Sequence, residues 1–283
     1  MASINCKGNL IDLSTPKVMG ILNLTPDSFY EGSRFSKDDA VLAQTEKMLA
    51  EGADFIDVGA YSSRPGADHI SVNEELSRLL PVVEVLIKNF PDLLISVDTF
   101  RSEVAKQAVQ AGAAIVNDIS AGHLDENMLT TIAALQVPYI MMHMKGTPQT
   151  MKNLAQYDDL VKEVIYYLSE RIAAARALGI NDLIVDPGFG FAKTIAHNFE
   201  LLNKSEQLQM LDVPVLIGVS RKSMIYKTLD VSAAEALNGT TVLNVVALQK
   251  GASILRVHDV KPAVEAVKLL EALSQSENGT ATI

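Results

Sequence analysis

Short apolar runs recur along the chain, and each carries or ends on a polar residue that is capable of chemistry. The runs are VMGILN, FIDVG, LISVD, AIVND, YIMMH, LIVD, VLIGVS and SILRVH. Their polar residues are Asn23, Asp57, Asp98, Asn117 with Asp118, His143, Asp186, Ser220, and Arg256 with His258. Nearly continuous Val, Ile and Leu are typical of parallel strands that are buried on both faces. The pattern therefore predicts eight parallel strands with polar groups at their carboxyl ends.

The segments between the strands have apolar residues at i, i+3 and i+4 spacing, which predicts amphipathic helices. The predicted helices cover residues 38–51, 73–89, 101–111, 126–135, 157–178, 197–209, 233–249 and 261–273. Several of them end on a glycine directly before the next strand, as at Gly52 and Gly112, and glycine supplies the left-handed residue that closes a helix. Strand and helix alternate with a mean repeat of about 34 residues, the length of one βα unit.

Eight such repeats predict an α/β fold of the TIM (β/α)8 barrel type, in which functional side chains gather at the carboxyl ends of the strands. We assign a single barrel domain to residues 17–273. A short lead-in, residues 1–16, precedes it, and a polar tail, residues 274–283, follows it and is expected to be flexible. The 283 residues, 48% of them hydrophobic, suit one domain, because such barrels run to about 250 residues or more.

Composition excludes several classes of partner. The formal net charge is −10 and no run of Lys or Arg occurs, which argues against a nucleic-acid partner. No apolar run reaches the roughly 18 residues of a membrane span, and the first residues lack the apolar core of a secretory signal. The single cysteine, Cys6, fits a reducing compartment. We therefore expect a cytoplasmic protein with small-molecule partners and with neither a nucleic-acid nor a membrane partner.

Two connections are longer than a βα loop requires. Residues 24–36 and 60–72 are each about 13 residues long, against the usual 2–6 or so. Both follow strand carboxyl ends, and each mixes Pro and Gly with hydroxyl groups, an Arg and an aromatic residue. We interpret them as lids that shield a substrate from water. An ordinary surface insertion is the alternative.

Asp98, Asn117 and Asp186 end the third, fourth and sixth predicted strands. A carboxylate at a barrel mouth can act as a general base, a metal ligand or an acceptor of N–H groups. An amide beside two carboxylates suits a flat heterocycle, whose edge mixes donors and acceptors. The alternative is that these residues cap the helices that follow them, and Asp98 before Thr99 fits a helix cap.

Four cationic side chains also follow apolar strands, namely Arg64, Lys222, Arg256 and His258. An Arg-x-His pair places both side chains on one face, because a strand repeats every second residue. A guanidinium suits phosphate oxygens, and Ser63 adds a hydroxyl donor. These groups predict an anion site made of side chains and loop amides, since the chain has no Walker motif. Scattered solvated charges are the alternative.

The pattern of histidines does not predict a zinc site, because neither HxH nor HExxH spacing occurs. A Mg²⁺ held mainly by substrate phosphates needs only one or two protein oxygens, and Asn23 at the end of the first strand is the candidate. No Ser-His-Asp set and no G-x-S-x-G elbow is evident. The sequence therefore predicts no protein nucleophile.

Taken in order, the motifs resemble those of the dihydropteroate synthase family over roughly residues 15–273. The motifs are GILNLTPDSF (20–29), SSRPG (62–66), SVDT (96–99), NDISAG (117–122), MMHMKG (141–146), DPGFGF (186–191), SRKS (220–223) and RVHDV (256–260). The resemblance implies a TIM barrel that joins (7,8-dihydropterin-6-yl)methyl diphosphate to 4-aminobenzoate. The implied products are 7,8-dihydropteroate and diphosphate, with Mg²⁺ as cofactor, sulfonamide analogues as inhibitors and a homodimer as the assembly.

The resemblance also implies a role for each matching residue. It places the pterin against Asp98, Asn117, Met142, Asp186, Phe191 and Lys222. It places the diphosphate against Ser63, Arg256 and His258, and a Mg²⁺ against Asn23. It places 4-aminobenzoate against Phe29, Arg64, Pro65, Ser220 and Lys222. The residues implied in catalysis are Asp98, Lys222, Arg256 and His258. Asp57 and His143 receive no role.

Three positions depart from the family's common pattern: Tyr61 in place of an acidic residue, Ser63 in place of Thr and Ala192 in place of Gly. Because Ser63 keeps the hydroxyl, we expect contact with phosphate to survive. Two alternatives remain open. A methyltransferase that moves a methyl group from a reduced folate to a corrinoid protein shares the barrel and the pterin-facing Asp and Asn, but has no use for the anion cluster. The other alternative is a non-catalytic pterin-binding protein.

Overall fold

The structure is a computed structural model that describes residues 3–24, 34–62 and 69–277. Most of the two long connections predicted to be lids lies outside the described residues. The same holds for four predicted site residues: Phe29, Ser63, Arg64 and Pro65. The remaining candidate residues are all described.

A parallel eight-stranded sheet forms the centre of the molecule, in the order β8-β7-β6-β5-β4-β3-β10-β9. The strands are β3 (Lys17–Asn23), β4 (Phe55–Gly59), β5 (Ile95–Asp98), β6 (Ile115–Asp118), β7 (Tyr139–Met142), β8 (Leu183–Asp186), β9 (Leu216–Ile217) and β10 (Ile254–Val257). A parallel bridge between Val185 and Val215 joins the two ends of the sheet. The predicted TIM barrel is therefore confirmed, although the seventh strand is only two residues long.

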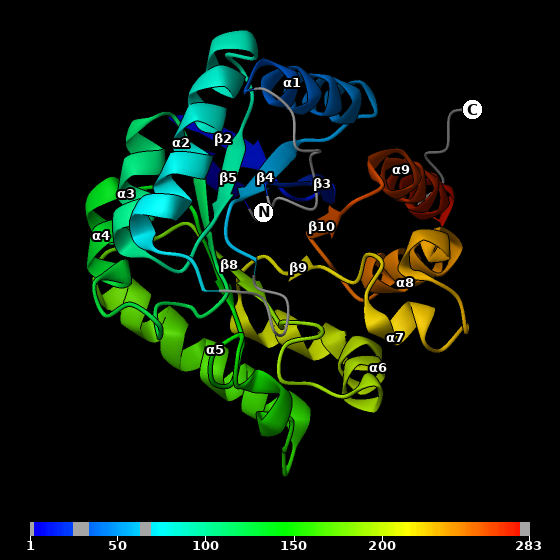
Figure 1. The fold of residues 1–283 in the computed structure, drawn as a ribbon. Coiled ribbons are helices and arrows are strands. Elements are labelled where there is room, and N and C mark those ends of the chain that lie inside the picture. Colours follow the sequence, from blue (N-terminus) through cyan, green and yellow to red (C-terminus); the bar gives the residue numbers. More distant parts are fainter. Residues whose placement is uncertain (1–2, 25–33, 63–68, 278–283) are drawn as a thin grey trace.

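Helices surround the sheet as a ring (Figure 1). They are α1 (Arg34–Ala50), α2 (Val72–Asn89), α3 (Ser102–Gln110), α4 (Met128–Leu135), α5 (Leu160–Ala177), α6 (Ile195–Asn203), α7 (Ser223–Tyr226), α8 (Leu237–Gln249) and α9 (Val260–Glu277). The helix predicted at 197–209 is wrong in its second half, where a 3₁₀ helix, Ser205–Leu211, follows α6. The Ser205 hydroxyl donates to the Leu202 carbonyl, and such side-chain bonds compete with regular helix geometry.

The helix predicted at 233–249 is also divided. Residues Ala233–Glu235 form a separate 3₁₀ turn before α8 begins. There Ser232 and Glu235 form a capping box, a signal for a new helix start rather than for a continuous helix. At the other end of the chain, α9 continues through Glu277, four residues into the segment predicted to be a flexible tail.

Side chains on the strands alternate between two apolar clusters, as the two-residue strand period requires. The cluster inside the barrel takes one residue from each of seven strands: Met19, Phe55, Ile115, Ile140, Ile184, Leu216 and Ile254. The larger cluster lies between the strands and the helices and includes Val18, Ile56, Val97, Val116 and Val185. Nearer the strand carboxyl ends, Asp57, Asp98, Asn117 and Arg256 face inward and contact one another, so the apolar interior forms the floor of a mouth that is largely polar.

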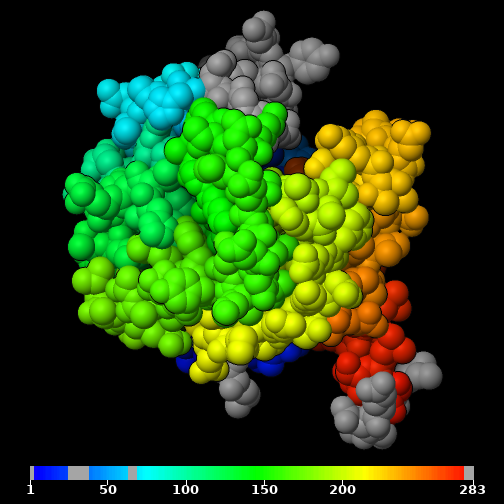
Figure 2. Space-filling model, turned by 90° about the horizontal axis from the view of Figure 1, so that it is seen from below, coloured from blue at the N-terminus to red at the C-terminus, as the bar shows by residue number. Residues whose placement is uncertain are grey.

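The lead-in forms an antiparallel hairpin, β1 (Ser3–Cys6) and β2 (Asn9–Asp12), which sequence reasoning did not predict. Ile4, Cys6 and Leu13 join the apolar cluster inside the barrel and thereby close its amino-terminal end. In Figure 2 the blue hairpin atoms emerge at the lower end of the molecule. Burial raises the pKa of the Cys6 thiol to about 12, so the thiol stays protonated at neutral pH.

Strand register brings the predicted polar residues into one row. Asn23 pairs with Gly59, Gly59 with Asp98, and Asp98 with Asn117. A Cβ atom at Gly59 would lie only 3.3 Å from the Cβ of Asp98, so glycine leaves space for that carboxylate. The register thus gathers residues from four strands at the same edge of the barrel.

Candidate active site at the barrel mouth

Arg256 and Asp57 form a buried ion pair at the centre of the mouth. Nε of Arg256 donates to Oδ2 of Asp57 at 2.6 Å, and Nη2 donates to Oδ2 of Asp98 at 2.9 Å. Nδ2 of Asn117 also donates to Oδ2 of Asp57, at 3.1 Å. The side chain of Asp57 is fully buried, so its negative charge is stabilised by these hydrogen-bond donors instead of by water. The network joins β4, β5, β6 and β10.

This network perturbs the acid–base properties of its members. Burial raises the pKa of Asp98 to about 7, the Arg256 guanidinium opposes that shift, and the carboxylate of Asp57 adds to it. Burial tends to lower the pKa of Arg256, but Asp57 and Asp98 more than offset this and raise it, so the guanidinium stays charged. Asp98 therefore changes protonation near neutral pH beside a permanent positive charge.

Asp186 ends β8 and directs a tight turn. Its Oδ1 accepts a hydrogen bond from the Gly188 N–H at 2.7 Å. Burial raises the pKa of this carboxyl group, while Lys222 and the Gly188 N–H favour the charged form. Gly188 has a φ of 73°, and a Cβ there would overlap the carbonyl oxygen of His143. Only glycine therefore allows the turn to pack against the end of β7.

Lys222 approaches the same turn from the other side. Its Nζ donates to the carbonyl of Phe189 and lies 5.3 Å from the centroid of the Phe191 ring. Burial lowers the pKa of Lys222 to about 8, and the nearby carboxylate of Asp186 opposes that shift. The ammonium thus lies near the Phe191 ring and the Asp186 carboxylate. The family resemblance places both of these groups at the pterin.

Met142 and Phe191 belong to a small apolar cluster beside these charges. Its buried members are Ile119, Met142, Met144, Met151 and Ala192, and the partly buried residues packed on them are Phe100, Leu124 and Phe191. Met142 pairs in register with Asp186, so the apolar and the acidic group come from neighbouring strands. A flat aromatic ligand suits such a combination of apolar faces with polar edges.

Ser220 and His258 contact each other across the ends of β9 and β10. The Ser220 hydroxyl lies 3.0 Å from Nδ1 of His258 and accepts a hydrogen bond from the His258 backbone N–H at 3.1 Å. Arg221, which follows Ser220, instead pairs with both carboxylate oxygens of Asp259 at 2.8 and 2.9 Å. The structure thus brings together one residue predicted for aminobenzoate and one predicted for diphosphate.

Asn23 is half-buried at the end of β3, beside Gly59 of the next strand. Among the described residues, no group of three or more His, Cys, Asp or Glu gathers into a metal site. A single amide oxygen fits a Mg²⁺ whose other ligands come from substrate phosphates and water, the arrangement that this small, strongly hydrated ion prefers. The donor set is therefore compatible with the predicted Mg²⁺.

The hydrogen bonds argue against the helix-cap alternative. The N-cap of α3 is Arg101, and the backbone N–H of Ser102 donates to Asp125 rather than to Asp98. Thr99 and Arg101 contact the buried carboxylate of Glu75, at 2.7 Å each. Asp98 is thus left to accept from Arg256.

Two interactions escaped sequence analysis. Asp57 received no role, although a carboxylate inside an otherwise apolar strand is itself a signal, because buried acids are almost always paired. Lys193 was not singled out, yet its Nζ lies 2.9 Å from Nδ1 of His143 in a buried position. No motif spacing relates Lys193 to His143, so only the fold reveals this pair.

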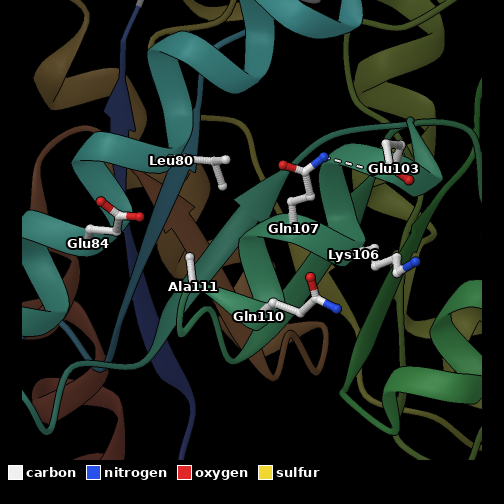
Figure 3. Close-up of a pocket in the computed structure, with 7 residues that line it drawn as sticks. All are labelled: Leu80, Glu84, Glu103, Lys106, Gln107, Gln110 and Ala111. Atoms are coloured by element: carbon white, nitrogen blue, oxygen red, sulfur yellow. Dashed lines mark hydrogen bonds between the residues drawn. The ribbon is translucent and has the colours of Figure 1, made fainter.

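A separate hollow of about 480 Å³ lies on the outside of the ring, between α2 and α3 (Figure 3). It is lined by Leu80, Glu84, Glu103, Lys106, Gln107, Gln110 and Ala111. None of these residues belongs to the mouth of the barrel. We therefore place the candidate site at the strand carboxyl ends and not in this hollow.

The fold and this polar mouth define a pterin-binding enzyme on a TIM barrel. The family model for "Pterin binding enzyme" matches residues 19–258, which span all eight strands from Met19 of β3. The chain is 44% identical over 276 residues to the dihydropteroate synthase of Escherichia coli K12, covering 96% of this chain and 97% of that protein. It is 42% identical to that of Haemophilus influenzae, covering 94% and 97%. The chain belongs to the dihydropteroate synthase family, whose members are transferases of folate synthesis.

Solved structures agree with this assignment. The Yersinia pestis dihydropteroate synthase with a sulfonamide drug superposes with a TM-score of 0.90 at 40% identity, covering 97% of this chain and 99% of that one. The Xanthomonas albilineans enzyme in complex with 7,8-dihydropteroate gives 0.85 at 37% identity, with the same coverage. These likenesses confirm the predicted family and favour it over the methyltransferase and the non-catalytic alternatives. Within the described residues, no helix has both the length and the apolar character needed to cross a membrane.

Proposed function

We propose that the barrel mouth joins (7,8-dihydropterin-6-yl)methyl diphosphate to 4-aminobenzoate and releases 7,8-dihydropteroate and diphosphate. The observation that carries this proposal is the buried network of Arg256 with Asp57 and Asp98, beside the Asp186 turn and Lys222. It offers carboxylates for the edge of a heterocycle and a fixed positive charge for an anionic leaving group.

The pterin is assigned to the pocket between Asp98 and Asp186. Carboxylates accept hydrogen bonds from the N–H groups of a pterin, and Asn117 and Lys222 supply donors for its ring nitrogens and carbonyl. Met142 and Phe191 offer apolar surface for its faces. The Asn117 amide is oriented by its bond to Asp57, so its oxygen and remaining N–H are held in place before substrate arrives.

The diphosphate is assigned to Arg256, His258 and Ser63, together with a Mg²⁺ at Asn23. Among the described residues, Nη1 of Arg256 donates to no other group, whereas Nε and Nη2 are taken by the two carboxylates. A guanidinium held in this way presents one edge to phosphate oxygens without losing its orientation. When bound, Mg²⁺ would neutralise part of the charge that develops on the departing diphosphate.

The reaction requires no protein nucleophile. The C–O bond between the pterin methylene and the diphosphate breaks, and both electrons leave with the diphosphate. The positive charge that develops at the methylene is offset by the carboxylate of Asp98. The aromatic amine then forms the C–N bond and gives up one proton to solvent. A neutral arylamine is already nucleophilic, so the protein needs chiefly to position it and to exclude water.

The 4-aminobenzoate is assigned to Ser220 and Lys222, with Phe29, Arg64 and Pro65 from the two long connections. Sulfonamides share the aromatic amine and an acidic group, so they are expected to compete for the same place. Because three of these residues belong to the two connections that the sequence predicts to be lids, we expect aminobenzoate to bind poorly before diphosphate and Mg²⁺ are present. Calorimetric titration with and without diphosphate measures this, and equal affinities would contradict the assignment.

We also propose a homodimer in the cytoplasm. Exposed apolar side chains gather on the segment from α7 to α9: Leu229, Leu237, Val242, Leu269 and Leu273. Apolar residues in such number on neighbouring helices are typical of an interface between subunits. Sedimentation velocity measures the assembly, and we expect a dimer-sized boundary. A single monomer-sized boundary at micromolar concentration would contradict the proposed homodimer.

A coupled assay tests the activity directly. Purified protein, pterin diphosphate, 4-aminobenzoate and Mg²⁺ are combined, and diphosphate release is followed with each component omitted in turn. We expect release coupled to dihydropteroate formation only in the complete mixture. Transfer of a methyl group from a methylated reduced folate to a corrinoid, with no diphosphate release, would instead support the methyltransferase alternative.

A further inference from the structure

Lys193 is a buried lysine that the proposed reaction does not use. Burial lowers the pKa of Lys193 well below its ordinary value, and the nearby carboxylate of Asp186 opposes that shift. The residue is 8% exposed and directly follows the turn that Asp186 begins. Its Nζ lies 2.9 Å from Nδ1 of His143, and it donates to the carbonyls of Gly188 at 2.9 Å and Phe191 at 3.1 Å. An ammonium has three N–H groups, and these three acceptors match that number.

The turn needs such a donor because its backbone is irregular. Gly188, Gly190 and Ala192 all have positive φ values, of 73°, 84° and 48°. A chain that alternates in this way does not pair its carbonyls in helix or sheet, and buried unpaired carbonyls are costly. Ala192 carries a Cβ at a positive φ, so this turn bears additional strain here. The Phe191 N–H donates to the Gly188 carbonyl at 3.2 Å, and Lys193 gives this carbonyl a second donor and also donates to the Phe191 carbonyl.

The two lysines at this turn divide its carbonyls between them. Lys222 donates to the carbonyl of Phe189 from the side of the mouth, whereas Lys193 holds Gly188 and Phe191 from the buried side. If Lys222 turns to the substrate, its bond to Phe189 weakens or is lost. Lys193 then still holds the Gly188 and Phe191 carbonyls, alongside Asp186 on the Gly188 N–H, Asn198 on the Gly190 N–H and Tyr157 on the Ala192 carbonyl.

His143 connects the turn to the neighbouring strand. It directly follows Met142 at the end of β7, and its backbone N–H donates to the carbonyl of Asp186 at 2.9 Å. Its ring packs at 77° against the ring of Tyr167, with centroids 4.8 Å apart. Burial, and then the charge of Lys193, lower the pKa of His143 well below its ordinary value, so the imidazole is neutral and its Nδ1 is available to accept.

We propose that Lys193 and His143 are a positioning pair for the pterin site. Lys193 donates to the Gly188 and Phe191 carbonyls and to Nδ1 of His143, and so holds Asp186 and Phe191 at a fixed place relative to Met142. Neither residue touches the reacting atoms. The inference rests on the proposed placement of the pterin, and it explains why a chain would retain a buried lysine and a buried histidine below that site.

Kinetics of Lys193→Met test the pair, with Lys204→Met, directly after α6, as the matched control. Lys204 is exposed and, within the described part of the chain, pairs with Glu200 one turn away. For Lys193→Met we expect KM for the pterin diphosphate to rise about tenfold to a hundredfold, as a displaced binding group would cause. We expect kcat, and KM for aminobenzoate at saturating pterin, to change by less than about threefold. Unchanged KM for the pterin would overturn the proposal.

Substitutions of His143 test the same pair if Lys193→Met fails to fold. His143→Asn keeps an acceptor near the position of Nδ1, whereas His143→Leu removes it. We expect His143→Leu to reproduce the rise in pterin KM and His143→Asn to recover most of the loss. An equal effect of both variants would show that the acceptor is irrelevant and would overturn the pair.

Nitrogen-15 NMR of the wild-type protein gives a readout that requires no variant. We expect the His143 ring to carry its proton on Nε2, with Nδ1 unprotonated from pH 5 to pH 8. A protonated Nδ1 would overturn the donor assignment. Asp186→Ala separates the two proposals by calorimetry with a pterin analogue. Retained pterin binding in Asp186→Ala refutes the pterin site itself, whereas its loss together with normal binding by Lys193→Met refutes only the pair.

Discussion

Arg256 and Asp57 lie 199 positions apart in the chain, yet Nε of Arg256 is 2.6 Å from Oδ2 of Asp57 inside the barrel. The same guanidinium holds Asp98 through Nη2. The buried carboxylate of Asp57 thus orients Arg256, which also contacts Asp98 at the mouth of the barrel. The arrangement makes Asp57 a support for two residues assigned to substrate, and it gives this aspartate a role that the sequence left open.

Asp57→Ala is expected to impair both stability and activity. The change leaves Arg256 and the Asn117 amide without a buried partner, and removing one member of a buried ion pair costs about 3 kcal/mol. Chemical denaturation measures the free energy of unfolding, and Asp92→Ala on the exposed surface is the control. If the two variants are equally stable, the Asp57–Arg256 pair does not support the fold.

Arg256→Ala is expected to lower kcat/KM about a hundredfold or more, the usual effect of losing one fixed group that stabilises developing charge. The steady-state rate of diphosphate release measures the effect. Arg78→Ala, which removes a half-buried cation paired with Glu74 on α2, controls for loss of charge alone. Wild-type kcat/KM in Arg256→Ala would remove this residue from the diphosphate site.

Asp186→Ala is expected to abolish pterin binding but to leave thermal unfolding nearly intact. Burial raises the pKa of Asp186 in the folded state above its unfolded value. The folded state therefore binds the proton of Asp186 more tightly than the unfolded state does. The contribution of Asp186 to the free energy of unfolding falls as pH rises from its unfolded pKa to its folded pKa. At neutral pH the charge favours ligand binding rather than folding. A collapse of the melting temperature would show a structural role instead.

The pH dependence of kcat/KM for the pterin substrate is expected to be bell-shaped. Asp98 must be ionised, and its raised pKa of about 7 sets the acidic limb. Lys222 must be protonated, and its lowered pKa of about 8 sets the alkaline limb, so the maximum falls between these values. Lys222→Arg should remove the alkaline limb, because a guanidinium does not titrate there. An alkaline limb that persists in Lys222→Arg would show that a group other than Lys222 titrates there.

The hairpin is expected to support stability without a role in turnover. Ile4 is buried in the inner cluster, and Ile4→Ala should lower the free energy of unfolding by about 3 kcal/mol while kcat stays at the wild-type value. Leu10→Ala in the same hairpin is the control, since Leu10 is 76% exposed. A loss of kcat in Ile4→Ala at a temperature where the protein is folded would link the hairpin to the site.

Several features followed from local pattern alone. Runs such as LISVD and LIVD predicted strands that end on Asp98 and Asp186, and both strands end there in the structure. Helix boundaries were less predictable, because the break between α6 and the following 3₁₀ helix depends on a single hydroxyl at Ser205. The hairpin was missed because its strands have four residues each and NLID exposes most of its side chains.

The sequence by itself determined the barrel, the edge at which its chemistry gathers, and the family, because strand period and motif order are local properties of the chain. Only the tertiary structure decided which charges meet. Arg256 lies against Asp57 and Asp98, and Lys193 lies against His143, because closure of the barrel and strand register bring distant residues within hydrogen-bond reach. Once there, burial removes water, and each charge must be paired by another side chain, which no spacing in the sequence records.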